Sequence, residues 1–97
     1  MTGKQKRYLR ALAHSLKPVV NLGKQGLSPE TRREIESQLL DHELIKCKVL
    51  DSCPLSKIEC ANELSGESEI DVVQVIGKTL VLFSPHPEEP KIKFPSA

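Results

Sequence analysis

The chain has 97 residues, enough for one small domain, and 38% hydrophobic with 28% charged residues is typical of a folded globular protein. No apolar run reaches the roughly 18 residues of a membrane helix, and the basic N-terminus lacks the apolar stretch of a signal peptide. The net charge of +1 hides an asymmetry: residues 1–33 carry eight basic and one acidic side chain, a net +7, and the remaining 64 residues carry six basic and twelve acidic ones, a net −6. Such a basic block indicates an unevenly charged surface and favours a polyanionic partner.

A first helix is predicted to begin near Gly3, because Thr2 and Gln5 have the spacing of a capping box. It should end near residue 16 or 17, since the residue before Pro18 avoids helical geometry. The apolar residues at helical spacing, expected to be buried, are Leu9, Leu12, Ala13 and Leu16. The opposite arc is cationic and holds Lys6, Arg7, Arg10, His14 and Lys17.

A short strand is predicted over residues 18–22, and a loop with two glycines, residues 23–26, follows it. Ser28 is placed to cap a second helix, with Pro29 at the first helical position. That helix is expected to continue to about Asp41. Its buried residues are expected to be Ile35 and Leu39, with Leu40 on the flank.

The segment 44–50 alternates apolar and basic residues, which is typical of a strand with one wet face. The core face should hold Ile45, Cys47 and Val49, and the wet face Lys46 and Lys48. A third helix is predicted after Ser56, which forms a second capping box with Glu59, and Gly66 is suited to end it. Its apolar face is expected to contain Leu55, Ile58, Ala61 and Leu64.

Two further strands, residues 70–76 and 79–83, are apolar at nearly every position, which favours a central place in a sheet. Gly77 and Lys78 join them as a two-residue turn of type II′. The tail, residues 84–97, holds four of the seven prolines and is expected to be extended and loosely held. The predicted fold is a single compact α+β domain in the order α-β-α-β-α-β-β, a four-stranded mixed sheet packed with three helices.

The loop Gly23-Lys24-Gln25-Gly26 is the segment that most directly indicates a function, namely anion binding. Glycines just before a helix start let the backbone approach a ligand, and free N–H groups there favour anions. The spacing fits neither a P-loop nor a dinucleotide fingerprint. A plain strand-to-helix turn remains the structural alternative. Arg32 and Arg33 follow on the second helix, where either could contact a polyanion or pair with Glu36 or Glu30.

Other candidate sites are weaker. The three cysteines, Cys47, Cys53 and Cys60, form no CxxC pair and are interpreted as reduced thiols. His14 and His42 are not expected to bind metal. We find no motif that joins a nucleophile, base or metal, so we expect neither catalysis nor a cofactor.

Three segments together resemble a known family: TGKQKRYLRALAHSLKPVVNLGKQGLSPE, DHELIKCKVL and VQVIGKTLVLF. They are similar to the CRM domain, named for chloroplast RNA splicing and ribosome maturation, over about residues 2–83. The resemblance is greatest to the single-domain bacterial members. It implies a fold similar to the C-terminal domain of translation initiation factor three and RNA binding without catalysis. It also implies an association with precursors of the large ribosomal subunit.

These observations together predict a cytoplasmic, monomeric RNA-binding protein that assists assembly of the large ribosomal subunit. The predicted RNA contacts are the loop residues Gly23, Lys24, Gln25 and Gly26, the first-helix residues Lys4, Lys6, Arg7 and Arg10, and the second-helix residues Arg32 and Arg33. The main alternative is an adaptor that docks on a ribosomal protein or assembly factor through the acidic second half of the chain. A small enzyme is the third possibility.

Overall fold

The computed structural model describes residues 1–67 and 69–95, and it confirms a four-stranded mixed sheet with three helices. The elements are α1 (Gly3–Ala13), β1 (Pro18–Leu22), α2 (Pro29–His42), β2 (Leu44–Val49), α3 (Lys57–Ser65), β3 (Asp71–Ile76) and β4 (Thr79–Phe83). The strand order is β1-β2-β4-β3, with β1 parallel to β2 and the other pairs antiparallel. Within the described residues, no helix is both long enough and apolar enough to span a bilayer.

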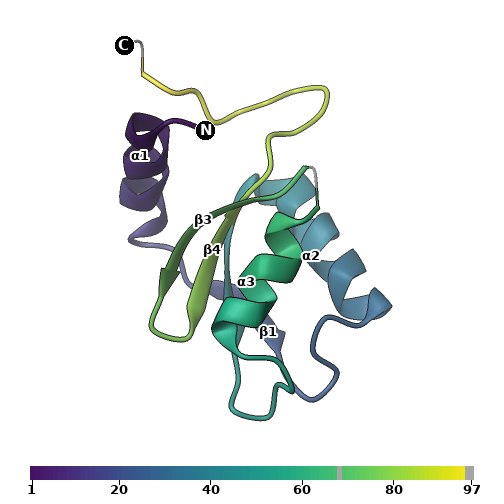
Figure 1. The fold of residues 1–97 in the computed structure, drawn as a ribbon. Helices are drawn as coiled ribbons and strands as arrows, with labels where there is room; N and C mark the ends of the chain where they lie inside the picture. Colours follow the sequence, from purple (N-terminus) through teal and green to yellow (C-terminus); the bar gives the residue numbers. More distant parts are fainter. Residues whose placement is uncertain (68, 96–97) are drawn as a thin grey trace.

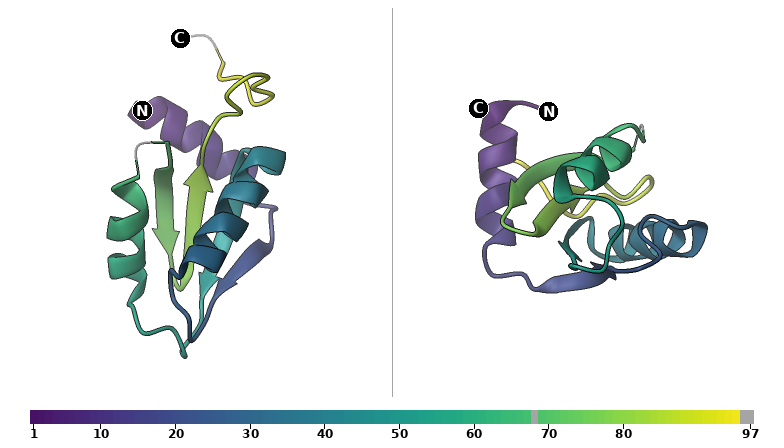
Figure 2. Two further views of the ribbon diagram at one scale, coloured as in Figure 1. Left: turned by 90° about the vertical axis from the view of Figure 1, so that its right-hand side faces the viewer. Right: turned by 60° about the horizontal axis from the view of Figure 1, so that its bottom comes forward.

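The helices are divided unequally between the two faces of the sheet. Figure 1 and Figure 2 show α2 and α3 side by side on one face and α1 alone on the other. The larger core lies under α2 and α3 and includes Ile35, Leu39, Ile45, Cys47, Cys60, Leu64, Leu80 and Leu82. The smaller core lies under α1 and consists of Leu9, Ala13, Leu44, Val73, Val81 and Phe83. β4, in the middle of the sheet, is therefore buried on both faces from Leu80 to Phe83.

The predicted helix starts are confirmed by their caps. The hydroxyl of Thr2 accepts the N–H of Gln5 at 3.1 Å, and the Gln5 side chain accepts the N–H of Thr2 at 2.9 Å. Ser56 and Glu59 form the same reciprocal pair at α3. Each box satisfies two N–H groups that a helix end otherwise leaves free. The turn before β4 is also as predicted, because Gly77 has a φ of +56°.

The predicted end of α1 was wrong. The helix stops at Ala13, and the next N–H groups form tighter bonds, from His14 to the carbonyl of Ala11 and from Leu16 to that of Ala13. Leu16 lies beyond the helix and is 37% exposed, and Leu12, still within it, is 40% exposed, so neither is buried as predicted. The chain then turns towards β1, which lies at the edge of the sheet.

The predicted apolar face of α3 was wrong at one position. Ile58 is 53% exposed, and Cys60 is fully buried in its place. Ile58 and Ala61 are three residues apart, but the helix packs on the sheet through Cys60, Ala61 and Leu64. The sequence pattern alone did not distinguish the two arcs, because Cys60 is itself a small apolar side chain.

The expectation of a loosely held tail was also wrong for residues 84–95. Ile92 and Phe94 pack against the smaller core. The ring of Phe94 lies 5.9 Å from that of Tyr8 and 5.8 Å from that of Phe83. Residues 96 and 97 of the predicted tail lie outside the described part of the chain. The tail thus acts as a cover for the α1 side of the sheet.

Glu43 fastens this tail. It is 3% exposed, and its carboxylate accepts the backbone N–H groups of His86, Lys91 and Ile92 at 2.8–2.9 Å. Its own carbonyl accepts the N–H of Ser84 at 2.9 Å. Burial alone would raise the pKa of Glu43, but the three backbone donors outweigh it and hold the pKa below the ordinary 4.5. Glu43 also has a φ of +65°, in the left-handed region that few residues other than glycine adopt.

Replacing Glu43 with Gln should lower the free energy of unfolding by about 1–3 kcal/mol at neutral pH, because an amide is a weaker acceptor for three N–H donors. The pKa of Glu43 is lower in the folded chain, so the contribution of its carboxylate is full above pH 4.5 and is lost as the pH falls. Urea unfolding at neutral and acidic pH measures both effects. Glu88→Gln, in the exposed part of the tail, is the control. Equal stabilities of the two variants would contradict the assignment.

Candidate nucleic-acid interface

The loop between β1 and α2 is a tight turn. The N–H of Gly26 donates to the carbonyl of Gly23 at 2.9 Å, which places Lys24 and Gln25 at the two corner positions of a β-turn. Both corner side chains are exposed. Lys24 forms no ion pair with any residue that the structure describes. The turn therefore presents one unneutralised cation and one amide to solvent.

The two glycines of the turn have different roles. Gly26 has a φ of +55°, and a Cβ there would lie 3.3 Å from Cγ of Pro54. Gly23 has no left-handed φ, and a Cβ there would meet Oγ of Ser52 at an ordinary 3.5 Å. Gly26 is thus required by the backbone and by its close packing against Pro54. The fold does not require a glycine at position 23, although the absence of a side chain there keeps the backbone open to a ligand.

The start of α2 is a weaker anion site than the sequence indicated. The hydroxyl of Ser28 already accepts the N–H of Thr31 at 3.2 Å. Pro29, at the first helical position, has no N–H, and Glu30 places a carboxylate in the first turn. These residues leave fewer free N–H groups at the start of α2 and partly neutralise its positive charge. Anion binding at this loop would therefore depend on Lys24 and on the backbone of the turn.

Arg32 braces α2 against α3. Its Nη2 lies 2.9 Å from Oε2 of Glu63, and its Nη1 is paired with Glu67. Its Nε donates to the carbonyl of Leu27 at 3.0 Å. The sequence analysis placed the alternative partners on the same helix, but the acids that bind Arg32 come from α3 and the residues after it, over thirty positions along the chain. Each of the three guanidinium nitrogens of Arg32 therefore already donates a hydrogen bond within the chain.

Arg33 differs from its neighbour. It is exposed and lies 3.9 Å from Glu30, one turn back on the same helix, as the sequence analysis allowed. An ion pair of this length between exposed side chains contributes little. The Arg33 guanidinium is therefore less engaged within the chain than that of Arg32.

The predicted cations of α1 are exposed but do not join the loop. The group consists of Lys4, Lys6, Arg7 and Arg10, all on the outer surface of α1. Figure 1 and the left view of Figure 2 place α1 at one end of the molecule and the β1–α2 loop at the other. Tyr8, on the same helix, packs on Phe94 and is half-buried. The basic residues thus form two separate areas rather than a single patch around the loop.

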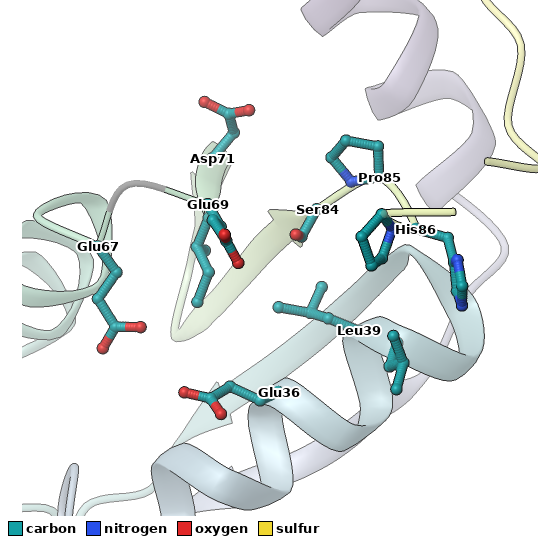
Figure 3. Close-up of a pocket in the computed structure, with 11 residues that line it drawn as sticks. Glu36, Leu39, Glu67, Glu69, Asp71, Ser84, Pro85 and His86 are labelled. Atoms are coloured by element: carbon teal, nitrogen blue, oxygen red, sulfur yellow. The ribbon is translucent and has the colours of Figure 1, made fainter. Parts of the chain in front are cut away.

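A groove of about 700 Å³ lies on the α2–α3 side, between α2, the beginning of β3 and the tail. Its apolar lining residues include Leu39, Leu40 and Ile70. Its acidic lining residues are Glu36, Glu67, Glu69 and Asp71. Figure 3 shows Glu36 on α2 and Glu67 after α3 on opposite sides of the opening, with Ser84 and His86 of the tail beside it. The acidic half of the chain therefore contributes a surface distinct from both basic areas.

The three cysteines are free thiols, and two of them are buried in the core. Burial raises the pKa of Cys47 and of Cys60 to about 12, so both stay protonated at neutral pH. The sulfur of Cys53 lies 4.0 Å from that of Cys60, and all three thiols are free. A buried, protonated thiol is a poor nucleophile.

Gly26→Ala should destabilise the protein by about 1–2 kcal/mol, because alanine at a left-handed φ is strained and its methyl group meets Pro54. Gly23→Ala in the same loop is the matched control and should change stability by less than about 1 kcal/mol. Thermal and urea unfolding measure both. Equal losses in the two variants would show that the glycines are not distinguished as the geometry indicates.

Arg32→Ala should lower stability by about 1–2 kcal/mol, because it removes two ion pairs and a bond to a backbone carbonyl. Arg33→Ala, its neighbour, should change stability by less than about 0.5 kcal/mol. Urea unfolding of both variants measures the difference. A neutral Arg32→Ala would mean that the brace between α2 and α3 contributes nothing.

Comparison with known proteins adds to this geometry. The family model of the CRS1/YhbY (CRM) domain matches residues 1–84. The chain is 40% identical over 95 residues to the Bacillus subtilis protein named "Probable RNA-binding protein YqeI", covering 98% of this chain and 99% of the relative. It is 44% identical over 95 residues to a Haemophilus influenzae protein named "RNA-binding protein", covering 98% and 95%. The solution structure of SAV1595 from Staphylococcus aureus matches with a TM-score of 0.77 and 38% identity, over 98% of this chain and 99% of that one. The chain therefore belongs to the CRS1/YhbY (CRM) domain family.

Proposed function

We propose that this chain is a non-catalytic, cytoplasmic RNA-binding protein that acts as a monomer. We further propose that it associates with large-subunit rRNA or pre-ribosomal particles and assists ribosome assembly. The observation that carries the proposal is the turn from Gly23 to Gly26, which holds Lys24 exposed and without an acidic partner among the described residues. Relatives of 40–44% identity that are named RNA-binding proteins support it. The ribosomal role rests on the resemblance to the single-domain bacterial members of the family.

The mechanism is electrostatic attachment to the RNA backbone. Lys24 supplies a cation at a rigid turn, and the glycine at position 23 lets a phosphate approach the main chain. The exposed cations of α1 give a second area of attachment, formed by Lys4, Lys6, Arg7 and Arg10. Arg33 adds a charge beside the turn, and Arg32 acts indirectly by bracing α2. Binding of this type weakens steeply with salt because it releases counterions.

The groove lined by acidic residues favours a second function, that of an adaptor for a basic ribosomal protein or assembly factor. Its volume of about 700 Å³ and its four acidic lining residues would suit a lysine- or arginine-rich segment. The described groups with a displaced pKa, namely Glu43, Cys47, Asp51, Glu59 and Cys60, do not line this groove, and their displacements follow from burial, from hydrogen bonds and from the Asp51–Lys78 pair. The groove therefore does not favour an enzyme. Tight binding to protein-free rRNA would make the adaptor role secondary.

Lys24→Glu should weaken binding to large-subunit rRNA fragments about tenfold or more at low salt, because it replaces a phosphate-binding cation with a repelling carboxylate. The slope of log affinity against log salt should also become shallower by about one unit. Filter binding or fluorescence anisotropy at two salt concentrations measures both.

Lys57→Glu is the control, since it makes the same charge change at an exposed lysine of α3 that is not part of the loop. Both variants should unfold at the wild-type temperature. If Lys24→Glu and Lys57→Glu bind as the wild type does, the loop is a plain turn and the proposed mechanism is wrong. If the wild type binds none of the rRNA fragments, the proposed function itself fails.

A further inference from the structure

Part of the sheet face below α1 has no cover. The helix packs through Leu9 and Ala13 on the half of this face that contains Leu44, Val81 and Phe83. In Figure 2, α1 crosses the sheet at the end where β4 finishes, far from the turn that joins β3 to β4. The other half of the same face is therefore left without a helix.

The strand pairing identifies the side chains of this half. Lys46 and Gln74 are both paired with Val81, so they share the α1 side of the sheet with it. One step nearer the turn, Thr79 is paired with both Lys48 and Ile76, and Lys48 is also paired with Asn21. We name this surface the open sheet face, and it consists of Asn21, Lys46, Lys48, Gln74, Ile76 and Thr79.

The open sheet face is cationic and accessible. Lys48 and Asn21 are exposed, and Lys46 is half-buried. Neither lysine forms an ion pair within the part of the chain that the structure describes. The nearby carboxylate of Asp51 is paired with Lys78, and that bond, together with a weaker attraction from Lys48, lowers the pKa of Asp51. The lysine charges therefore remain available to an outside partner.

The open sheet face lies between the two basic areas. β2 begins at Leu44, beneath α1, and the N–H of Leu50, just after its end, donates to the carbonyl of Leu22 at 2.9 Å. Leu22 immediately precedes the glycine turn. Lys46 and Lys48 thus stand in a row along the line from α1 to the turn, about 7 Å apart as alternate residues of one strand.

We propose that the backbone of an RNA crosses the open sheet face, with its phosphates on Lys46 and Lys48. This inference rests on the proposed RNA-binding function and supplies a path between two areas that the fold keeps apart. Asn21, Gln74 and Thr79 provide hydrogen-bonding groups for sugars or bases along the path. The exposed side chain of Ile76 adds an apolar contact at its end. RNA suits this surface better than a protein segment because the only formal charges on it are positive.

The test compares lysines on the two sides of the sheet. Lys48→Gln should weaken binding to a large-subunit rRNA fragment about threefold or more, and the double variant Lys46→Gln/Lys48→Gln about tenfold or more, with a shallower salt slope. Lys57→Gln removes the same charge from α3, on the far side, and should change affinity less than about twofold. A single-stranded oligonucleotide and a duplex, assayed in parallel, show which form of RNA follows the path.

A second readout uses two isoleucines of equal exposure. Ile76, on the open sheet face, is 54% exposed, and Ile58, on α3, is 53% exposed. Adding RNA should shift the methyl resonances of Ile76 and leave those of Ile58 unchanged.

Three outcomes would overturn the inference. If the double variant binds RNA as the wild type does while Lys24→Glu loses binding, the path is wrong and the RNA-binding function stands. If the double variant loses binding only to an acidic polypeptide such as polyglutamate, the open sheet face serves a protein partner. If the wild type binds no RNA, the inference falls together with the proposed function.

Discussion

A four-stranded sheet with two apolar faces must be covered on both sides, and here three helices are shared between the faces two to one. β4 has apolar side chains on both faces: Leu80 and Leu82 lie in the larger core, and Val81 and Phe83 lie in the smaller one. α2 and α3 together cover their face, whereas α1 alone cannot. The docked tail, fastened by Glu43, supplies part of the missing cover, and the remainder stays open. The open sheet face thus exists because one helix and the tail cover only part of that side of the sheet.

The features predicted well from the sequence were those set by neighbours in the chain. The caps at Thr2 and Ser56 and the turn at Gly77 each depend on a few adjacent residues. The features predicted badly depend on distant partners. Docking of the tail requires Glu43 to meet residues more than forty positions away, and the partners of Arg32 come from another helix. No local pattern carries such contacts, because apolar spacing specifies a face but not what lies against it.

In the candidate site, too, the local features were predicted and the long-range arrangement was not. Exposure of Lys24 at a glycine turn follows from the sequence of the loop, and the alternation in β2 correctly placed Lys46 and Lys48 opposite the larger core. The distance between the basic helix and the loop could not be foreseen, since it depends on which end of the sheet α1 crosses. Charge is also distributed unevenly in space, with the acidic groove on the α2–α3 side and the lysines of the open sheet face on the other, although both belong to the acidic second part of the chain. A molecule with this charge distribution is oriented by the field of a polyanion before contact.

The contact between Tyr8 and Phe94 joins the two ends of the described chain. The smaller core likewise joins Leu9 to strands that are made last, through Val73 and Val81. Loop-closure entropy makes contacts of such long sequence separation slow to form. During synthesis, α1 therefore leaves the ribosome long before anything can cover its apolar side. The native burial of α1 therefore waits for the strands and the tail at the other end of the chain.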